Sequence, residues 1–194
     1  MGNHNPARLT GSTDTRIVMR KLLRLLVIPM VIAFAIAFSS TASAAITTTF
    51  NPANAPSGTH VQRGTPTCTV NGLDVSCSSF ELAGVGNTNA TADLSASYSA
   101  TVVCINGGGN PSDSQHQGSF TAANSTGQLS PKNGRLTVPS LAVVAPTEDQ
   151  FLAQQTCPNP NWTPTIPGGI TLSSFTYTVS FAGFNGAYIT ITGP

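Results

Sequence analysis

Apolar and polar residues alternate along the segment Asp93–Ile105, and this pattern predicts its conformation. Every second residue from Leu94 to Cys104 is apolar, whereas serine or threonine fills most of the positions between them. Successive side chains of a β-strand point to opposite faces, so one face enters a core and the other faces water. A helix would spread the same residues around its whole surface. We therefore predict a central strand of an antiparallel sheet here, with Cys104 near its end.

Shorter segments with the same alternation predict further strands before and after the central one. Among the expected strands are Ile46–Phe50, Phe80–Ala83 and Gln115–Ala122, and a hairpin is expected at Cys68–Cys77. Asn54–Gly64 contains Pro and Gly and is expected to be a loop, and Asn124–Gly127 is expected to turn the chain back. The apolar residues around Pro139 are expected at a sheet edge or between strands, because proline lacks the amide that a ladder needs.

The chain ends in a pattern that predicts a hairpin. Apolar residues alternate within Phe175–Phe181 and resume at Ile189. We place Phe181 opposite Ile189, which keeps both apolar sets on one face and leaves Phe184–Gly186 as a three-residue loop. The apolar positions just upstream are out of phase with this strand, so we also predict a bulge at Ser173–Ser174.

One segment, Pro146–Thr156, has the features of a short helix. Thr147 is followed three residues later by Gln150, which is a capping box, and two acids fall in the first turn, where the helix dipole favours them. The following stretch, Asn159–Gly169, holds three prolines and the single tryptophan, Trp162. We expect an extended loop there.

The first part of the chain resembles a secretory signal. Basic residues precede Leu25–Phe38, a run of 14 residues without charge, and a small-x-small sequence then ends at Ala44. The run is shorter than the roughly 20 apolar residues of a membrane-spanning helix, which argues against an uncut anchor. We expect cleavage between Ala44 and Ala45, with 1–44 as the signal and 45–194 as a single domain. Translation from Met19 instead of Met1 would give a more ordinary signal.

The mature chain predicted by this cleavage carries little charge. Its 150 residues include three Lys and Arg against six Asp and Glu, for a net charge of −3. Three scattered cations do not form a surface for nucleic acid or anionic lipid. We therefore expect no nucleic-acid partner, and contact with a membrane only through the signal before cleavage.

Four cysteines follow the cleavage site: Cys68, Cys77, Cys104 and Cys157. An even number in an exported chain favours two disulfides, and four thiols allow three pairings. A hairpin around Asn71–Asp74 places Cys68 opposite Cys77, within disulfide reach, whereas a two-residue Asn-Gly turn would leave them diagonal. If this bond forms, Cys104 pairs with Cys157. Zinc does not fit, because no two cysteines are two to four residues apart and no histidines are paired.

Few residues of the mature chain predict catalysis. Asp113 and His116 lie close in sequence, and one of the many serines could complete a hydrolase triad, but a nucleophile elbow is absent. The other histidine, His60, lies among loop residues. No glycine-rich loop opens onto a helix, so we expect no nucleotide and no other cofactor. Trp162 is the candidate ligand-binding residue, since it could stack on a sugar ring or anchor a partner. The alternative is that it packs against the body of the protein near Cys157.

Four segments resemble small exported proteins of high-GC Gram-positive bacteria: Phe80–Ala92, Lys132–Leu141, Cys157–Pro164 and Phe175–Gly193. That resemblance implies export and no particular activity. The composition is also similar to that of neocarzinostatin-like carrier proteins, which are secreted, rich in small residues and built on an immunoglobulin-like sandwich with two disulfides. The cysteine spacing differs from that family after the first pair, so no binding residue is transferred.

Together these features predict an all-β domain, an immunoglobulin-like or related antiparallel β-sandwich of about seven to nine strands with one short helix. We expect a non-catalytic protein, exported to the cell exterior or the cell envelope, that acts as a structural or binding module. The loops around Gly107–Pro111 and Asn159–Gly169 are its expected contact surface. The alternatives are a carrier with an apolar cleft between its sheets and, as the less favoured interpretation, a secreted hydrolase.

Overall fold

The structure is a computed structural model that describes residues 45–194, apart from the side chains of residues 113 and 114. The signal predicted for residues 1–44 lies outside the described residues. The described chain is all-β, with one short α-helix and one 3-10 helix, η1 (Pro52–Asn54). Its strands are β1 (Thr47–Phe50), β2 (His60–Arg63), β3 (Cys68–Asn71), β4 (Asp74–Cys77), β5 (Phe80–Ala83), β6 (Ala90–Ile105), β7 (Pro111–Leu129), β8 (Arg135–Val138), β9 (Leu141–Val143), β10 (Thr163–Thr165), β11 (Thr171–Phe181) and β12 (Ala187–Gly193).

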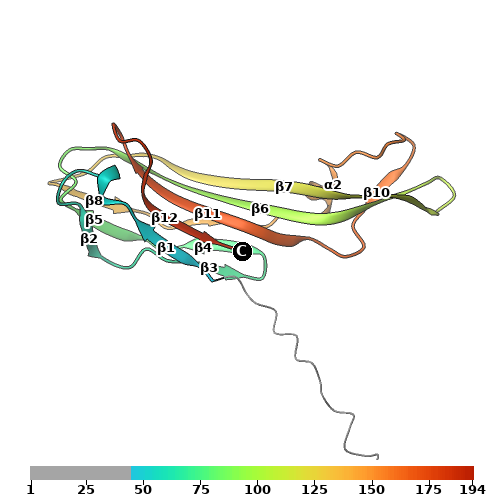
Figure 1. The fold of residues 1–194 in the computed structure, drawn as a ribbon, viewed down its shortest axis with the longest axis horizontal. Coiled ribbons are helices and arrows are strands. Elements are labelled where there is room, and N and C mark those ends of the chain that lie inside the picture. Colours follow the sequence, from blue (N-terminus) through green and yellow to red (C-terminus); the bar gives the residue numbers. More distant parts are fainter. Residues whose placement is uncertain (1–44) are drawn as a thin grey trace, which may run out of the picture. The chain divides into compact units, whose positions relative to one another are not determined.

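A six-stranded antiparallel sheet contains the longest strands (Figure 1). Its order is β1-β12-β11-β6-β7, and β10 pairs with the last residues of β6, beyond the end of β11. Two three-stranded sheets, β2-β5-β8 and β3-β4-β9, complete the fold. Buried residues from all three sheets belong to one apolar cluster, which places the small sheets against one face of the large one. We call this covered face the inner face.

The predicted central strand is β6, and it is longer than expected by three residues at its start. Its alternate residues from Leu94 to Cys104 are at most 4% exposed. They form the inner face, as the period-two pattern requires. The core also contains Phe175, Tyr177 and Ile191 from the neighbouring strands. The alternation of the sequence therefore determines which face of the sheet is buried.

Two tyrosines tie the large sheet to the segments that cover it. The Tyr98 hydroxyl donates to the Leu73 carbonyl over 3.2 Å, and the Tyr188 hydroxyl donates to the Thr59 carbonyl over 3.2 Å. A buried hydroxyl without a partner would cost about 1–3 kcal/mol. These bonds therefore let large aromatic rings enter the core without leaving their hydroxyls unpaired.

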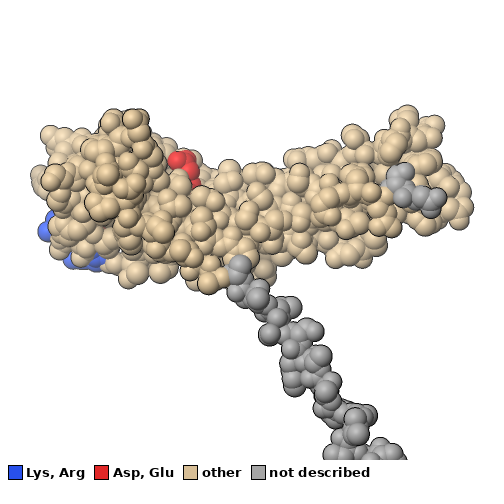
Figure 2. All heavy atoms as spheres, viewed as in Figure 1, with Lys and Arg blue, Asp and Glu red and all other residues tan. Residues whose placement is uncertain are grey.

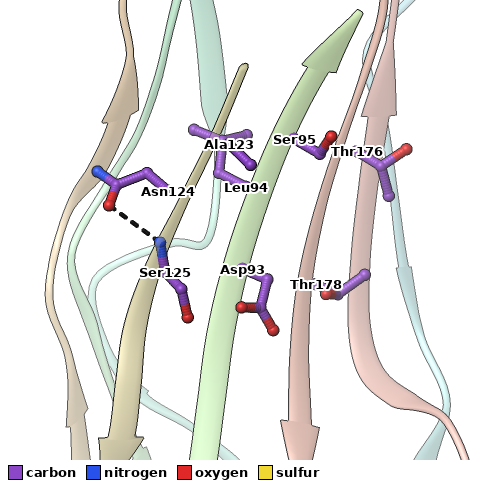
Figure 3. Close-up of a pocket in the computed structure, with 8 residues that line it drawn as sticks. All are labelled: Asp93, Leu94, Ser95, Ala123, Asn124, Ser125, Thr176 and Thr178. Atoms are coloured by element: carbon purple, nitrogen blue, oxygen red, sulfur yellow. Dashed lines mark hydrogen bonds between the residues drawn. The ribbon is translucent and has the colours of Figure 1, made fainter. Parts of the chain in front are cut away.

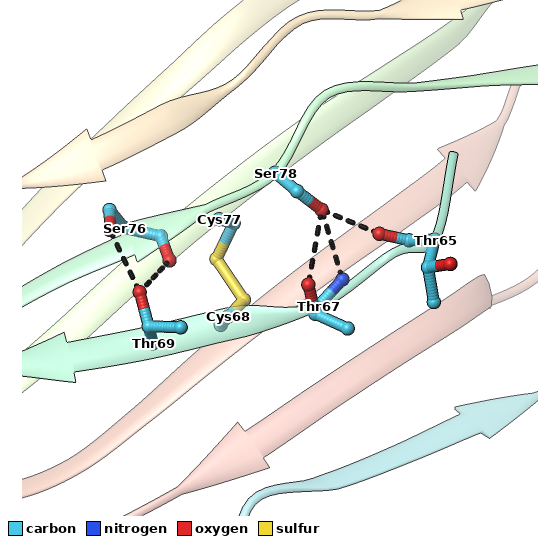
Figure 4. The surroundings of a disulfide bond; sticks show 7 residues. All are labelled: Thr65, Thr67, Cys68, Thr69, Ser76, Cys77 and Ser78. Carbon is cyan, nitrogen blue, oxygen red and sulfur yellow. Dashed lines mark hydrogen bonds between the residues drawn. A yellow bond between two sulfur atoms is a disulfide. The ribbon is translucent and has the colours of Figure 1, made fainter. Parts of the chain in front are cut away.

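The predicted hairpin disulfide is present between Cys68 and Cys77, whose Cα atoms are 4.0 Å apart (Figure 4). The two cysteines are directly opposed on β3 and β4, and Asn71 is opposed to Asp74. The ladder next to the bond is supported by Ser78, whose hydroxyl donates to the Thr65 carbonyl over 2.6 Å. In the chain-entropy estimate such a short closure stabilises the fold by about 3 kcal/mol.

The second disulfide joins Cys104 at the end of β6 to Cys157, with Cα atoms 5.9 Å apart, and confirms the other predicted pair. It holds the segment after the helix against the inner face of the β6–β7 hairpin. Gly118 of β7 leaves room for this segment, because a Cβ atom would lie 2.6 Å from the Gln155 side chain and 2.8 Å from that of Val102, and these side chains would have to shift. Phe151 stacks on Phe120 beside it, with ring centroids 6.4 Å apart.

The helix, α2, spans Glu148–Leu152 and is shorter than the predicted Pro146–Thr156. The predicted capping box is present: the Thr147 hydroxyl accepts from the Gln150 amide, and the Gln150 side chain accepts from the Thr147 amide. Phe151 is its buried residue. After the helix, residues 153 and 154 form a turn, and residues 155–157 lead without regular structure to the tethered Cys157.

The predicted register of the last hairpin is wrong by two residues. Val179, not Phe181, lies opposite Ile189, and β11 and β12 are joined by the five-residue segment 182–186. Either register places the same residues on the inner face, so periodicity does not distinguish them. In the structure Phe181 pairs with Ala90 on β6 and its ring packs against Phe184 and Tyr188, which extends β11 beyond β12.

Three predicted loops or turns contain strand residues instead. Asn124–Gly127 does not reverse the chain but forms an irregularity within β7, where the Thr126 hydroxyl accepts from the Ala92 amide over 3.0 Å. The predicted loop Asn54–Gly64 contains β2, and Asn159–Gly169 contains β10. The bulge predicted at Ser173–Ser174 is present in the pairing of β11 with β6. Pro139 lies between β8 and β9, as expected.

Candidate contact surface: a hydroxyl face on the six-stranded sheet

The outer face of the six-stranded sheet is a regular array of hydroxyl side chains, which we call the hydroxyl face. Directly opposed residues share a face, so the pairing registers define its rows. One row runs across β1, β12, β11, β6 and β7, and the next row lies two residues further along each strand. The first row is Thr49, Thr190, Thr178, Asp93 and Ser125, and the second is Thr47, Thr192, Thr176, Ser95 and Ala123.

Further rows continue the array toward the β6–β7 turn. Ser97 lies between Ser174 and Thr121, and Ser99 lies between Thr171 and Ser119. Strands are spaced about 4.8 Å apart and alternate residues of a strand about 6.7 Å apart, so these side chains form a two-dimensional lattice. The large hydrophobic side chains of these strands point to the inner face instead. The sheet therefore presents hydroxyls and small methyl groups to its surroundings.

Most of these hydroxyls are free to bond a ligand or water. Among the described residues, the side chains of Thr176, Thr178 and Ser95 have no hydrogen-bond partner. Ser99 is an exception, because its hydroxyl lies 2.7 Å from that of Ser173 and 3.2 Å from that of Thr171. A free hydroxyl can donate one hydrogen bond and accept two, so the face offers both functions at each lattice point.

A shallow hollow of about 300 Å³ lies in this face around Asp93 (Figure 3). Asp93 lies between Ser125 of β7 and Thr178 of β11, and Ser95 lies beside Thr176 one row further on. A second hollow of about 180 Å³ adjoins it along β6, lined in part by Thr91, Gln128 and Ser180. Both hollows lie along β6, and hydroxyl, amide and carboxylate groups stand among apolar atoms in their lining.

Asp93 is the one charged residue in the rows of the hydroxyl face, and the cations lie elsewhere. Arg63 is on β2, Lys132 is bridged to Arg135 beside β8, and Arg135 pairs with Glu81 over 3.2 Å. Figure 2 shows one side of the molecule, where charged atoms are confined to two small areas and most of the surface is uncharged. The array therefore suits a neutral, polar ligand better than a strongly charged one.

The two loops predicted as the contact surface lie at one end of β6, on either side of Ile105. Pro111 of β7 and Thr163 of β10 are both paired with Ile105. The glycine-rich segment is an ordered turn, in which the Asn106 side chain accepts from the Gly108 and Asn110 amides over 2.9 and 3.1 Å. Trp162 is half-buried, and its amide donates to the Asn159 carbonyl. Trp162 is therefore neither fully buried in the protein nor fully exposed to solvent.

The two histidines lie on strands of different sheets. His60 is exposed on β2, and its ring nitrogens lie near the Gly58 carbonyl and the Gln62 side chain. His116 is half-buried on β7, opposite Val102. In the described part of the chain, no three His, Cys, Asp or Glu side chains are grouped as they would be to hold a metal ion. None of its helices is long and apolar enough to span a membrane.

Tyr177 is the one buried polar side chain of the described residues that lacks a partner. Burial raises the pKa of its hydroxyl, and the negative charge of Asp93 raises that pKa further. Burial also raises the pKa values of Tyr98 and Tyr188. These phenols therefore stay neutral in conditions where an exposed tyrosine would begin to ionise.

Comparison with known proteins gives no relative for this chain: no family model, curated protein or solved structure matches it. Function must therefore be inferred from the surface of the protein alone. Sequence reasoning identified the polar side of β6 but not the hydroxyl face as a whole. The signal was present as Thr-x-Thr in three segments, Thr47–Thr49, Thr176–Thr178 and Thr190–Thr192.

Proposed function

We propose that the protein is a non-catalytic, exported binding module that uses the hydroxyl face to contact a neutral, polyhydroxylated ligand such as a cell-envelope polysaccharide. The observation that carries this proposal is the register of the hydroxyl rows across five strands. Sugar hydroxyls both donate and accept, and so do the side chains of this face. Asp93 adds one strong acceptor to the centre of the array.

Export is part of the proposal, and the covalent structure supports it. Both disulfides form in the described chain, and disulfides persist in oxidising compartments. We propose cleavage between Ala44 and Ala45 by a signal peptidase, which would release a chain that begins immediately before β1. The layered arrangement of antiparallel sheets is compatible with the expected relation to immunoglobulin-like sandwiches, which we retain as a proposal.

The packing of the core favours a contact module over the carrier alternative. A carrier would need an apolar cleft between its sheets. Here the inner face of β6 and β11 is filled by its own side chains, and Tyr98, Phe175 and Tyr177 are at most 1% exposed. The hollows around Asp93 lie on the outer face instead. A thermal-shift screen with apolar compounds would revive the carrier if such compounds alone stabilised the protein.

The experiment that tests the proposal is co-sedimentation of the protein with insoluble cellulose, chitin and purified peptidoglycan. We expect retention on at least one of them. The double variant Thr176→Val and Thr178→Val keeps the side-chain shape and removes two hydroxyls. At about 0.5–1.5 kcal/mol for each lost hydrogen bond, it should weaken binding by roughly fivefold to a hundredfold.

The controls decide between this face and the predicted loops. Thr137→Val changes an exposed threonine on β8, away from the hydroxyl face, and should bind as the wild type does. Binding that is lost in Trp162→Ala but unchanged in the double valine variant would assign the contact to the loops and overturn the role of the hydroxyl face. A hydrolytic activity that disappears in His116→Ala would overturn the non-catalytic assignment.

A further inference from the structure

β1 and β7 are edge strands on opposite sides of the six-stranded sheet, and in the described chain neither pairs with a strand on its outer side. An open edge presents unpaired amides and carbonyls and is a template for another strand. Proteins commonly block such edges with charged side chains, above all lysine. No charge occurs in β1 or in residues 115–129 of β7. Both edges are therefore left without that protection.

The outward-facing groups of β7 can be identified from their neighbours. The Ser99 carbonyl accepts from the Thr171 hydroxyl of β11, so the backbone groups of Ser99 point away from β7. Its opposed residue Ser119 then points away from β6, and the Gln155 side chain donates to its carbonyl over 3.2 Å. By alternation, Thr121 and Ala123 also point outward. No described residue bonds their amides or carbonyls.

An apolar groove of about 450 Å³ runs beside this outward edge, on the inner side of the sheet. Phe120 and Ala122 of β7 line it together with Val144 and Pro146, and Gln150 and Gln154 add polar groups to the lining. Val144 is 72% exposed. Further along β7, the Asn124 side chain donates to the Ala142 carbonyl over 2.9 Å and links β7 to β9. The groove is thus an apolar recess next to free backbone groups.

The opposite edge carries the matching side chains. Ile46 and Phe50 are 41% and 47% exposed, and together with Val144 they are the exposed large hydrophobic residues of the described chain. Phe50 is opposed to Ile189, so it points to the inner side of the sheet. Ile46 lies four residues earlier and therefore has the same orientation. The apolar side chains of β1 and the groove beside β7 thus lie on the same side of the sheet.

We propose that copies of this chain join head to tail, with β1 of one copy added as a strand along β7 of the next. Strand addition supplies backbone hydrogen bonds, and Ile46 and Phe50 enter the groove between Phe120 and Val144. A sheet continued in this way keeps all inner sides together and all hydroxyl faces together. The outward-facing Thr47 and Thr49 of one copy then extend the hydroxyl face of its neighbour beyond β7. The assembly multiplies the hydroxyl face.

The alternative pairing of β7 with β7 of another copy fits less well. Both copies would bring their own α2, which stacks Phe151 on Phe120, to the same side of the seam. It would also leave Ile46 and Phe50 exposed. The contact between β1 and β7 joins two different surfaces, so it does not close on itself unless a ring forms, and it generates open chains.

The test measures molar mass without any ligand, by light scattering after gel filtration and by sedimentation velocity over a range of concentrations. The protein is purified with both disulfides formed. For the wild type, the mass should rise with concentration above that of one chain. Ile46→Lys and Val144→Glu should each remain monomeric, because each places a charge in the apolar contact. Ala182→Lys, at an exposed loop position, should assemble as the wild type does.

Mixing the two charged variants, Ile46→Lys and Val144→Glu, gives the sharpest result. In an equimolar mixture the unaltered β1 of the Val144→Glu copy meets the unaltered groove of the Ile46→Lys copy, so chains should join again. The other seam brings the introduced ammonium group to the introduced carboxylate, so the mixture should grow into alternating chains, although neither variant assembles alone. Circular dichroism of each variant shows whether it is folded. A wild type that stays monomeric at every concentration would overturn the proposal, and so would an Ile46→Lys variant that assembles normally. The outcome is separable from polysaccharide binding, since monomeric variants keep their hydroxyl face.

Discussion

On β6, Leu94 and Ala96 are fully buried and Tyr98 is 1% exposed, whereas Asp93 is exposed and Ser95 is half-buried on the opposite face. These residues are neighbours in one strand, so backbone geometry and position in the fold are shared. The inner side chains supply the burial that stabilises the sheet, and the outer hydroxyls contribute little to it. Residues of the outer face can therefore be selected for contact with a ligand, because the stability of the sheet does not depend on them. The following predictions test that division, beginning with the largest effect.

The largest loss of stability is expected from removing the disulfide of Cys104, at the end of the inner face of β6. Replacing Cys104 and Cys157 together by alanine opens a closure of 53 residues, which should lower the free energy of unfolding by about 4 kcal/mol. The matching change at Cys68 and Cys77, a separation of 9 residues, should cost about 3 kcal/mol. Urea unfolding of both variants provides the measurement. A smaller loss for the longer closure would contradict the chain-entropy argument.

Leu94 and Ser95 offer a direct test of the two faces. Leu94→Ala leaves a cavity in the core and should lower the free energy of unfolding by about 3 kcal/mol. Ser95→Ala removes an outer hydroxyl and should change it by less than about 0.5 kcal/mol. Thermal and urea unfolding of the two variants, side by side, check the difference. Equal effects would mean that the outer face also holds the fold together.

Tyr177 is the exception on the inner face, because its buried hydroxyl has no partner among the described residues. Tyr177→Phe keeps the ring and removes the unpaired group, so it should raise the free energy of unfolding by about 1 kcal/mol. Tyr98→Phe is the matched control. It removes a hydroxyl bonded to the Leu73 carbonyl and should lower stability by about 1 kcal/mol. Loss of stability in Tyr177→Phe would show that this hydroxyl has a partner after all.

Ionisation of Tyr177 should also make the stability of the fold depend on pH in alkaline solution. The folded-state pKa of Tyr177 is raised by burial and by Asp93, above the value of about 10 for an exposed tyrosine. The stability that depends on its neutral form is complete below pH 10 and is lost as the pH rises further. Stability measured at increasing pH should therefore fall less steeply in Tyr177→Phe. Identical pH profiles would exclude Tyr177 as a source of the alkaline loss.

Local patterns were sufficient to predict several features of the fold. The period of two in β6 predicted its buried face, because the side chains of a strand alternate regardless of their neighbours. The Cys68–Cys77 bond follows from a hairpin whose two cysteines are only 9 residues apart. The capping box at Thr147 also lies within one turn of helix. In each case the residues that decide the structure are close together in the sequence.

Other features were decided by contacts between distant residues. The register of β12 on β11 depends on Phe181, which packs with Phe184 and Tyr188 and pairs with Ala90. Thr126 lies in a segment that resembles a turn, yet its hydroxyl takes the place of a ladder bond to Ala92. The proline-rich β10 becomes a strand because the Cys104–Cys157 bond holds the preceding segment beside the end of β6.

The alternation of residue types along each strand is enough to place hydroxyls on its outer side. That Thr49, Thr178 and Asp93 lie in one row depends on strand order and register, which local sequence does not encode. The same holds for the two open edges, which lie 61 residues or more apart in the chain and become complementary only when the sheet has formed. Periodicity assigns a side chain to a face, whereas its neighbours on that face depend on long-range pairing.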